Sequence, residues 1–274
     1  MKFGLSFPNF GAYAEPSVLM DLAIEAEDAG WDGFFPWDHV VVADRMPVAD
    51  PWVLMAAIAA STERIRFGPM VAALPRHRPW IVARQAVSLD RLSGGRFNLG
   101  AGLGFPPREE FGTFGDPEDE RVRAEMLDEG LEIILGVWSN RPFGFDGRHY
   151  SVVETTFAPP PLQQPRIPIW MAAMLPNRRP VRRAARYDGI YPINSDMSPV
   201  TPEQVAEVRR LVNEHRSADE PFDIAVGGGP ASAQRLTEYE EAGLTWYVGG
   251  PRPEGEEVHE TMAWVREGPG AYVG

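Results

Sequence analysis

The feature of this chain that most constrains its fold is the regular alternation of short apolar runs with segments of helical periodicity. The runs that read as strands are Lys2–Phe7, Gly33–Trp37, Ile65–Leu74, Arg96–Gly100, Ile167–Ala173, Gly189–Ile193, Asp223–Val226 and Thr245–Val248. The segments that read as helices are Ser17–Ala29, Pro51–Ser61, Trp80–Leu92, Glu120–Val137, Arg178–Arg186, Pro202–Arg216, Ala231–Ala242 and Pro253–Glu267. Strands that alternate with helices predict a parallel sheet, because each return to the same end needs a crossover.

This alternation over 274 residues is typical of an α/β fold of the (β/α)₈ barrel type, and a doubly wound open sheet is the alternative. We favour the barrel because several strands end in residues suited to ligand binding, as barrel strands do at their carboxyl ends. We expect a single domain over residues 1–274. An irregular loop at 105–119 follows the fourth strand, and a proline-rich insertion at about 140–166, with a hairpin near Asp146-Gly147, precedes the fifth.

Composition excludes several function classes. The chain has no cysteine, and its five histidines show no metal-ligand spacing, so we expect no metal site. A net charge of −13 argues against nucleic acid or an anionic membrane as a partner. The chain opens directly on a predicted strand and has no apolar run of transmembrane length, so we expect a soluble, cytoplasmic protein.

The block Ser93–Gly104 is the clearest candidate for a ligand site. Ser93-Gly94-Gly95 ends a helix, and the short strand that follows carries Gly100, Gly102 and Gly104 at alternate positions. One face of this strand end therefore has no side chains, which lets a flat ligand or a phosphate come close to the backbone. A tight turn without a ligand explains the spacing equally well.

The second predicted strand ends in Trp37-Asp38-His39. The charge of a histidine changes near neutral pH, so His39 suits general acid–base catalysis. Asp38 could hold the orientation of the His39 ring or contact a cofactor. The alternative is that His39 is a structural histidine. His77, between Arg76 and Arg78 after the third strand, could reach the same mouth, although a loop histidine is more often exposed and idle.

Several segments together resemble the luciferase-like flavin and deazaflavin oxidoreductases, a family of TIM barrels. The matching segments are GLSFP, AEDAGWDGFFPWDH, RIRFGPMV, LSGGRFNLGAGLG, LEIILGVWSNRPFGFDGRHY and PRIPIWMAAMLPNRRPVRRAARYDGIYP, which cover nearly the whole chain. The resemblance implies FMN or the deazaflavin coenzyme F420 at the strand carboxyl ends, a small-molecule substrate and a homodimer. FMN-using members often carry Glu-His-His where this chain has Trp37-Asp38-His39, so the resemblance favours F420, with FMN as the alternative.

The resemblance also implies which residues contact the cofactor. Family members carry a non-proline cis peptide in the third strand, which we expect at Met70–Val71, so that Met70, Val71 and Ala72 lie behind the ring. Gly102 and Gly104 follow from the glycine block. The family places the cofactor phosphate after the fifth strand, which makes Ala172, Ala173, Asn177 and Arg178 the remaining candidates.

The basic segment that opens with Arg178 and Arg179 supports an anion at that helix N-terminus, where free N–H groups point outward. Arg182, Arg183 and Arg186 are expected to be solvated or paired with carboxylates. The glycines of Gly227–Ser232 are a competing phosphate site, since barrels often bind phosphate after the seventh strand.

One departure from the family bears on the reaction. Sugar-phosphate dehydrogenases of the F420 branch carry a glutamate directly after the glycine-rich strand, where this chain has Phe105, with Glu109 and Glu110 further on. The departure argues against a sugar phosphate and favours a larger or more apolar substrate. Three hypotheses follow: an F420-dependent oxidoreductase that transfers a hydride, an FMN-dependent monooxygenase, and a non-catalytic flavin-binding barrel.

Overall fold

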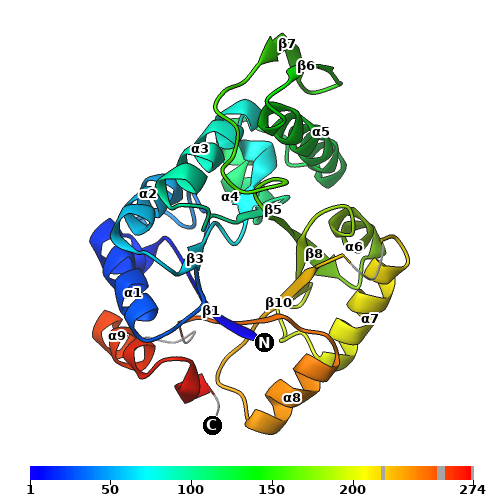
Figure 1. The fold of residues 1–274 in the computed structure, drawn as a ribbon. Coiled ribbons are helices and arrows are strands. Elements are labelled where there is room, and N and C mark those ends of the chain that lie inside the picture. The colour runs from blue at the N-terminus through cyan, green and yellow to red at the C-terminus, as the bar shows by residue number, and fades with distance from the viewer. Residues whose placement is uncertain (217–219, 252–256, 273–274) are drawn as a thin grey trace.

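The computed structural model describes residues 1–216, 220–251 and 257–272. Its centre is a parallel sheet of nine strands in the order β3-β2-β1-β11-β10-β9-β8-β5-β4. The strands are β1 (Lys2–Phe7), β2 (Gly33–Pro36), β3 (Arg66–Phe67), β4 (Ala72–Ala73), β5 (Leu99–Gly102), β8 (Ile169–Leu175), β9 (Gly189–Asn194), β10 (Asp223–Gly227) and β11 (Trp246–Gly249). The two strands at the ends of this order, β3 and β4, are consecutive parts of one predicted strand, so the curled sheet closes into a ring (Figure 1).

The helices surround this ring, as expected for the predicted barrel (Figure 1). They are α1 (Pro16–Asp28), α2 (Pro51–Ser61), α3 (Pro79–Leu92), α5 (Glu120–Trp138), α6 (Arg178–Ala184), α7 (Pro202–Asn213), α8 (Ala233–Glu241) and α9 (Val258–Glu267), with short turns η1 (Gly11–Tyr13), η2 (Leu74–Arg76) and η4 (Pro269–Tyr272). Proline opens α1, α2, α3 and α7, a position where its missing N–H costs no helical hydrogen bond. Thr201 caps α7, in a capping box with Gln204. Pro253, the predicted start of the last helix, lies outside the described residues.

The third and fourth barrel strands differ from the prediction. The third is broken between β3 and β4, and the cis peptide expected at Met70–Val71 is present there. The fourth runs to Gly102 rather than to Gly100. A Cβ atom on Gly100 would lie 2.0 Å from the carbonyl oxygen of Pro69, so this glycine serves the close approach of the two strands.

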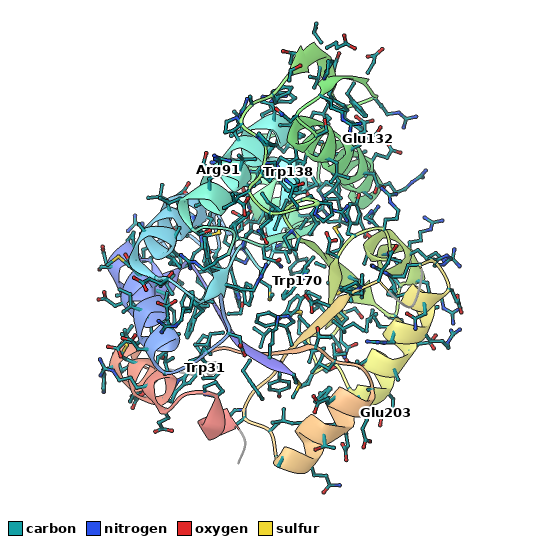
Figure 2. All side chains as sticks on the ribbon, in the orientation of Figure 1. Trp31, Arg91, Glu132, Trp138, Trp170 and Glu203 are labelled. Carbon is teal, nitrogen blue, oxygen red and sulfur yellow. The ribbon has the colours of Figure 1, made fainter. Side chains whose placement is uncertain are left out.

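Two apolar layers fill the molecule. The inner layer lies within the ring and is built on an aromatic cluster of Phe35, Trp170 and Trp246, whose ring centroids lie 5.3–5.7 Å apart. Figure 2 shows Trp170 inside the ring of strands. The outer layer lies between the strands and the helices and contains most of the buried side chains. Side chains therefore fill the interior of the ring around this aromatic cluster, so the ring is not an open pore.

The two predicted irregular segments carry structure of their own. The loop at 105–119 contains α4 (Pro107–Glu110) and the turn η3 (Gly112–Phe114). The insertion carries the predicted hairpin, formed by β6 (Pro142–Asp146) and β7 (Ser151–Thr156), which pair antiparallel. Among the described residues, no helix is long and apolar enough to cross a lipid bilayer.

Candidate active site

A cluster of charged side chains gathers at the carboxyl ends of the second, third and fourth barrel strands. Asp38 and His39 follow β2, Arg76 and His77 follow β4, and Glu110 ends helix α4 after β5. Because the strands are parallel, these three loops meet at the same end of the ring. The sequence predicted Asp38 and His39 at this place and left open that His77 and Arg76 reach it. The structure brings both of them to the cluster and adds Glu110.

Glu110 is the centre of the cluster, and its side chain is 1% exposed. Its Oε1 atom lies 2.9 Å from Nδ1 of His39, and its Oε2 atom contacts Nη1 of Arg76. The N–H group of Val40 also donates to Glu110, at 3.3 Å. Since Arg76 and Val40 can only donate, Glu110 acts as an accepting carboxylate, and Nδ1 of His39 carries the proton that it accepts.

Asp38 has different partners from those the sequence suggested. Its Oδ1 atom lies 2.8 Å from Nη2 of Arg76, and its Oδ2 atom lies 3.0 Å from Nε2 of His77 and accepts from the N–H of Ala73 at 3.0 Å. The prediction that Asp38 orients the His39 ring is therefore wrong, because the Asp38 side chain is buried and bonded elsewhere. The interpretation of His77 as an idle loop histidine is also wrong.

The protonation of Asp38 follows from its surroundings. Burial alone would raise the pKa of the Asp38 carboxyl. The hydrogen bond and charge of His77, together with Arg76 and the N–H of Ala73, outweigh burial, so the pKa lies below its ordinary value. Asp38 is thus a stable anion that holds Arg76 and His77 in place.

His39 is neutral in its resting state. Burial lowers the pKa of the imidazole, Asp38 opposes this with its negative charge, and Arg76 lowers the pKa further, so the net value lies below the ordinary one. With the proton on Nδ1, the free nitrogen is Nε2, which is bonded to no described residue. A neutral imidazole with a free Nε2 can accept a proton from a bound molecule.

The backbone of His39 is fixed as firmly as its ring. Asn9, which is fully buried after β1, accepts from the His39 N–H at 3.1 Å and donates to the His39 carbonyl at 2.8 Å. The ring packs edge-on against Phe10 with centroids 5.4 Å apart, and the ring of Trp37 lies 5.9 Å away. The side chain of His39 stays 22% exposed, so the imidazole is held in place and remains accessible.

The inner wall of the ring beside this cluster contains three predicted cofactor contacts. A Cβ atom on Gly102 would lie 2.8 Å from Cγ2 of Val71 and 3.2 Å from Cβ of Ala172. Val71 and Ala172 are half-buried and flank the glycine. A flat ligand would therefore contact these two small side chains, and the predicted bare glycine face is in fact covered. A wall of small, partly accessible side chains fits the ring of a flavin-type cofactor.

The other predicted cofactor contacts do not all face the interior of the ring. Met70 packs within the inner layer, whereas Ala72 and Ala173 belong to the outer layer, so their side chains do not face the interior of the ring. Gly104 has a φ of 80° and is packed against Phe111. Contact between these residues and a cofactor stays a prediction.

The predicted site for the cofactor phosphate, at the N-terminus of α6, is exposed. Asn177 caps α6 by accepting from the N–H of Arg179 at 3.1 Å. Arg178 lies 3.5 Å from Glu207 of α7, and Arg183 forms a two-pronged pair with Asp128, as expected for the later arginines. For a phosphate to bind here, Arg178 would have to leave Glu207 and contact the phosphate instead. At the competing site, the carbonyl of Gly229 accepts a hydrogen bond from Tyr247.

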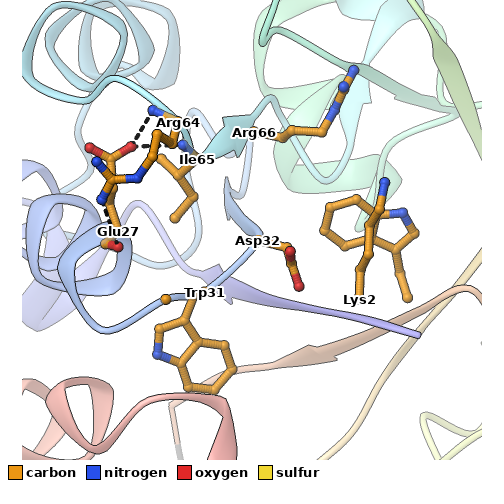
Figure 3. Close-up of a pocket in the computed structure, with 9 residues that line it drawn as sticks. Lys2, Glu27, Trp31, Asp32, Arg64, Ile65 and Arg66 are labelled. Carbon is orange, nitrogen blue, oxygen red and sulfur yellow. Dashed lines mark hydrogen bonds between the residues drawn. The ribbon is translucent and has the colours of Figure 1, made fainter.

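A cavity of about 300 Å³ lies at the opposite end of the ring, where the strands begin (Figure 3). It is lined by Lys2, Glu27, Gly30, Trp31, Asp32, Arg64, Ile65, Arg66 and Trp246. The Glu27 carboxylate is used by the N–H groups of Glu63, Arg64 and Ile65. Since the amino ends of barrel strands serve stability rather than chemistry, this cavity is not the candidate active site.

The fold and the site define the class of protein, an α/β barrel with a buried, charged cluster at the carboxyl ends of its strands. A family model described as luciferase-like monooxygenase matches residues 1–270, and the chain belongs to this family. The resemblance stated from the sequence motifs is confirmed.

The chain is similar to several curated proteins. It is 36% identical over 214 residues to an uncharacterized protein of Mycobacterium tuberculosis. The aligned region covers 78% of this chain and 71% of the relative. It is 36% identical over 140 residues to 4-hydroxyprotoasukamycin monooxygenase of Streptomyces nodosus, covering 47% of this chain and 38% of the relative. It is 31% identical over 181 residues to an F420-dependent glucose-6-phosphate dehydrogenase of Nocardia farcinica, covering 63% and 51%.

Solved structures share the fold. An F420-dependent secondary alcohol dehydrogenase superposes with a TM-score of 0.77 at 17% identity, covering 97% of this chain and 98% of the other. The monooxygenase RslO1 of Streptomyces bottropensis superposes with a TM-score of 0.76 at 22% identity, covering 97% of each chain. At these identities the likeness shows the fold alone, and the predicted barrel is confirmed.

Proposed function

We propose that this chain is an oxidoreductase that transfers a hydride between coenzyme F420 and a small organic substrate, with His39 as the group that exchanges the proton. The observation that carries the proposal is the contact between His39 and Glu110. A buried carboxylate fixes Nδ1 and leaves Nε2 free at the end of the ring where barrel enzymes carry out chemistry. When bound, such a cofactor donates or accepts the hydride, and the protein must orient the substrate and exchange one proton.

The charged cluster can exchange that proton in either direction. Nε2 of His39 accepts a proton from a substrate hydroxyl when the substrate is oxidised, and returns it when the substrate is reduced. Once Nε2 is protonated, the imidazolium lies 2.9 Å from the Glu110 carboxylate, which stabilises the new charge. Arg76 contacts both Glu110 and Asp38, so one cation is shared by the two buried carboxylates.

Support for F420 comes from the sequence around the cluster. The chain has Trp37-Asp38-His39 where FMN-using relatives often carry Glu-His-His. The curated F420-dependent dehydrogenase of Nocardia farcinica is 31% identical over 181 residues. Phe105 in place of the expected glutamate argues against the substrate of that relative for this chain.

An FMN-dependent monooxygenase is the second candidate. It is favoured by the 36% identity with 4-hydroxyprotoasukamycin monooxygenase over 140 residues. In that case the same inner wall of Val71 and Ala172 would contact the flavin ring, and His39 would exchange a proton with the substrate. The geometry of the cluster serves both reactions, so the cofactor must be decided by binding.

The test is a titration of the purified protein with F420 and, separately, with FMN, followed by cofactor fluorescence or calorimetry. Tight binding of F420 with weak binding of FMN supports hydride transfer and directs substrate screening to alcohols, carbonyl compounds and activated double bonds. The reverse preference contradicts the F420 proposal and makes the monooxygenase the leading hypothesis. Binding of neither cofactor would indicate a non-catalytic barrel.

A further inference from the structure

Tyr191 of β9 faces the interior of the ring, beside the wall that holds the predicted cofactor contacts. It pairs in register with Ala172 of β8 and packs against the inner aromatic layer. Its neighbour Ile190 is fully buried in the outer layer, as the alternation of side chains along a strand requires. Tyr191 itself is half-buried, so its side chain contacts both the packed core and accessible space.

The hydroxyl of Tyr191 has no hydrogen-bond partner in the part of the chain that the structure describes. Two buried tyrosines of the outer layer behave differently, since Tyr239 donates to the carbonyl of Val200 at 2.6 Å and Tyr247 to that of Gly229 at 2.7 Å. The Tyr191 hydroxyl is not among the polar atoms that are both sealed from solvent and unpaired. It is therefore an unpaired donor that is not fully sealed from solvent.

The neighbouring strand leaves room for this hydroxyl. A Cβ atom on Gly227 of β10 would lie 2.6 Å from the hydroxyl oxygen of Tyr191. Any larger residue at Gly227 would have to displace the hydroxyl. The absence of a side chain at this position therefore leaves the space that the hydroxyl occupies.

The surroundings also fix the chemical state of the group. Burial raises the pKa of Tyr191 to about 12. The phenol stays protonated at neutral pH and can offer a hydrogen bond to an acceptor. Next to it along the wall lie Ala172 and then Gly102 and Val71, the residues expected to contact a flat ring.

We propose that the Tyr191 hydroxyl donates a hydrogen bond to a carbonyl oxygen or ring nitrogen of the molecule bound in the barrel. This inference rests on the proposed function, because it takes the inner wall of the ring as the binding site. The acceptor belongs either to the cofactor ring or to the substrate. Both sources present the same chemistry, and binding measurements distinguish them.

The test compares the wild-type protein with Tyr191→Phe, which removes only the hydroxyl, and with Tyr239→Phe as the matched control. If the acceptor is on the cofactor, Tyr191→Phe weakens cofactor binding roughly threefold to tenfold, the effect of one neutral hydrogen bond. If the acceptor is on the substrate, cofactor affinity stays the same and KM rises by a similar factor. In either case the loss is the same at pH 6 and pH 8, because the phenol does not titrate there.

A second variant separates hydrogen bonding from packing. Gly227→Ala should impair the same step as Tyr191→Phe, since the added methyl group displaces the hydroxyl. The two losses should not add, so Gly227→Ala has a much smaller effect when Phe already occupies position 191. Equal losses in both backgrounds would contradict the inference.

Failure of the inference and failure of the proposed function give different results. If the wild-type protein binds a cofactor and Tyr191→Phe changes neither cofactor affinity nor KM, the inference is wrong and the function stands. If the wild-type protein binds neither F420 nor FMN, the proposed function is wrong and the inference falls with it. A thermal unfolding midpoint of Tyr191→Phe equal to that of the wild type confirms that the variant is folded.

Discussion

The Nδ1 atom of His39 lies 2.9 Å from Oε1 of Glu110, although 71 positions separate the two residues in the chain. One residue follows the second barrel strand and the other ends a short helix after the fourth. Arg76, from the loop after the third strand, contacts Glu110 and Asp38. The charged cluster is therefore assembled from three loops that the barrel brings to one end.

Replacement of Glu110 by Gln should impair catalysis and stability together. The amide keeps the shape but loses the charge that stabilises a protonated His39, so kcat/KM should fall roughly 10- to 100-fold, as expected for a lost charged hydrogen bond. Steady-state kinetics and urea unfolding measure the two effects. The control is Glu109→Gln, because Glu109 forms no ion pair among the described residues. Equal behaviour of the two variants would contradict the role given to Glu110.

Replacement of His39 by Gln should separate binding from turnover. Loss of the proton acceptor should lower kcat by a factor of about 10² to 10⁴, while the cofactor dissociation constant stays near the wild-type value. Rapid-mixing kinetics and cofactor titration measure the two quantities on the same sample. His149→Gln is the control, because His149 pairs with Glu125 away from the cluster. A fully active His39→Gln would show that His39 is structural.

The stability of the protein should fall in mild acid, in part because of His39. Its pKa in the folded state lies below the ordinary value of 6.5, so the unfolded chain binds the proton more readily. The stabilising contribution of His39 is therefore complete above pH 6.5 and is lost as the pH falls towards the folded pKa. Urea unfolding at several pH values checks this. The free energy of unfolding of His39→Gln should fall less steeply than that of the wild type.

Arg76→Met should strongly destabilise the fold. The change removes the cation between Asp38 and Glu110 and leaves two buried carboxylates without their shared partner. The loss of one member of a buried ion pair costs about 3–5 kcal/mol in the free energy of unfolding. Arg78→Met is the control, because Arg78 is exposed and packs over Trp80. A loss below about 1 kcal/mol for Arg76→Met would indicate that the cluster is solvated.

Gly100→Ala tests the contact between the third and fourth barrel strands. The new Cβ atom would lie 2.0 Å from the carbonyl oxygen of Pro69, which is backbone and cannot move freely. We expect a loss of about 3 kcal/mol or more in the free energy of unfolding. Gly229→Ala, where no atom lies within 4 Å of the added carbon, should change stability little. Similar unfolding curves for the two variants would contradict the close approach.

Much of the fold follows from the sequence because regular elements leave a periodic signal. The boundaries of most strands and helices lie close to those that the pattern predicts. The broken third strand could not be read from the pattern, since Ile65–Leu74 is a continuous apolar run. The cis peptide at Met70–Val71 was expected only from the family resemblance.

The site was less accessible to such reasoning. His39 was found because it follows a strand. Its partner Glu110 lies in an irregular loop, where no hydrophobic periodicity indicates which side chains are buried. The burial of Glu110 depends on contacts with distant loops, and these leave no local signal. Asp38 was misread for a related reason, since its partners Arg76 and His77 come from another loop and its place beside His39 in the sequence does not reveal them. The absence of a glutamate at position 105 was visible, and Glu110 shows that a carboxylate reaches the cluster from further along the loop.

The ion pairs among the loops after the second, third and fourth strands divide the barrel rim into two sectors. One sector consists of these three loops, which buried ion pairs hold together. A change in any one of the three loops would therefore disturb the other two. The other sector, formed by the loops after β8, β9 and β10, makes no ion pair with this cluster in the described residues. Selection or laboratory evolution can therefore change these loops while the buried charged cluster stays intact.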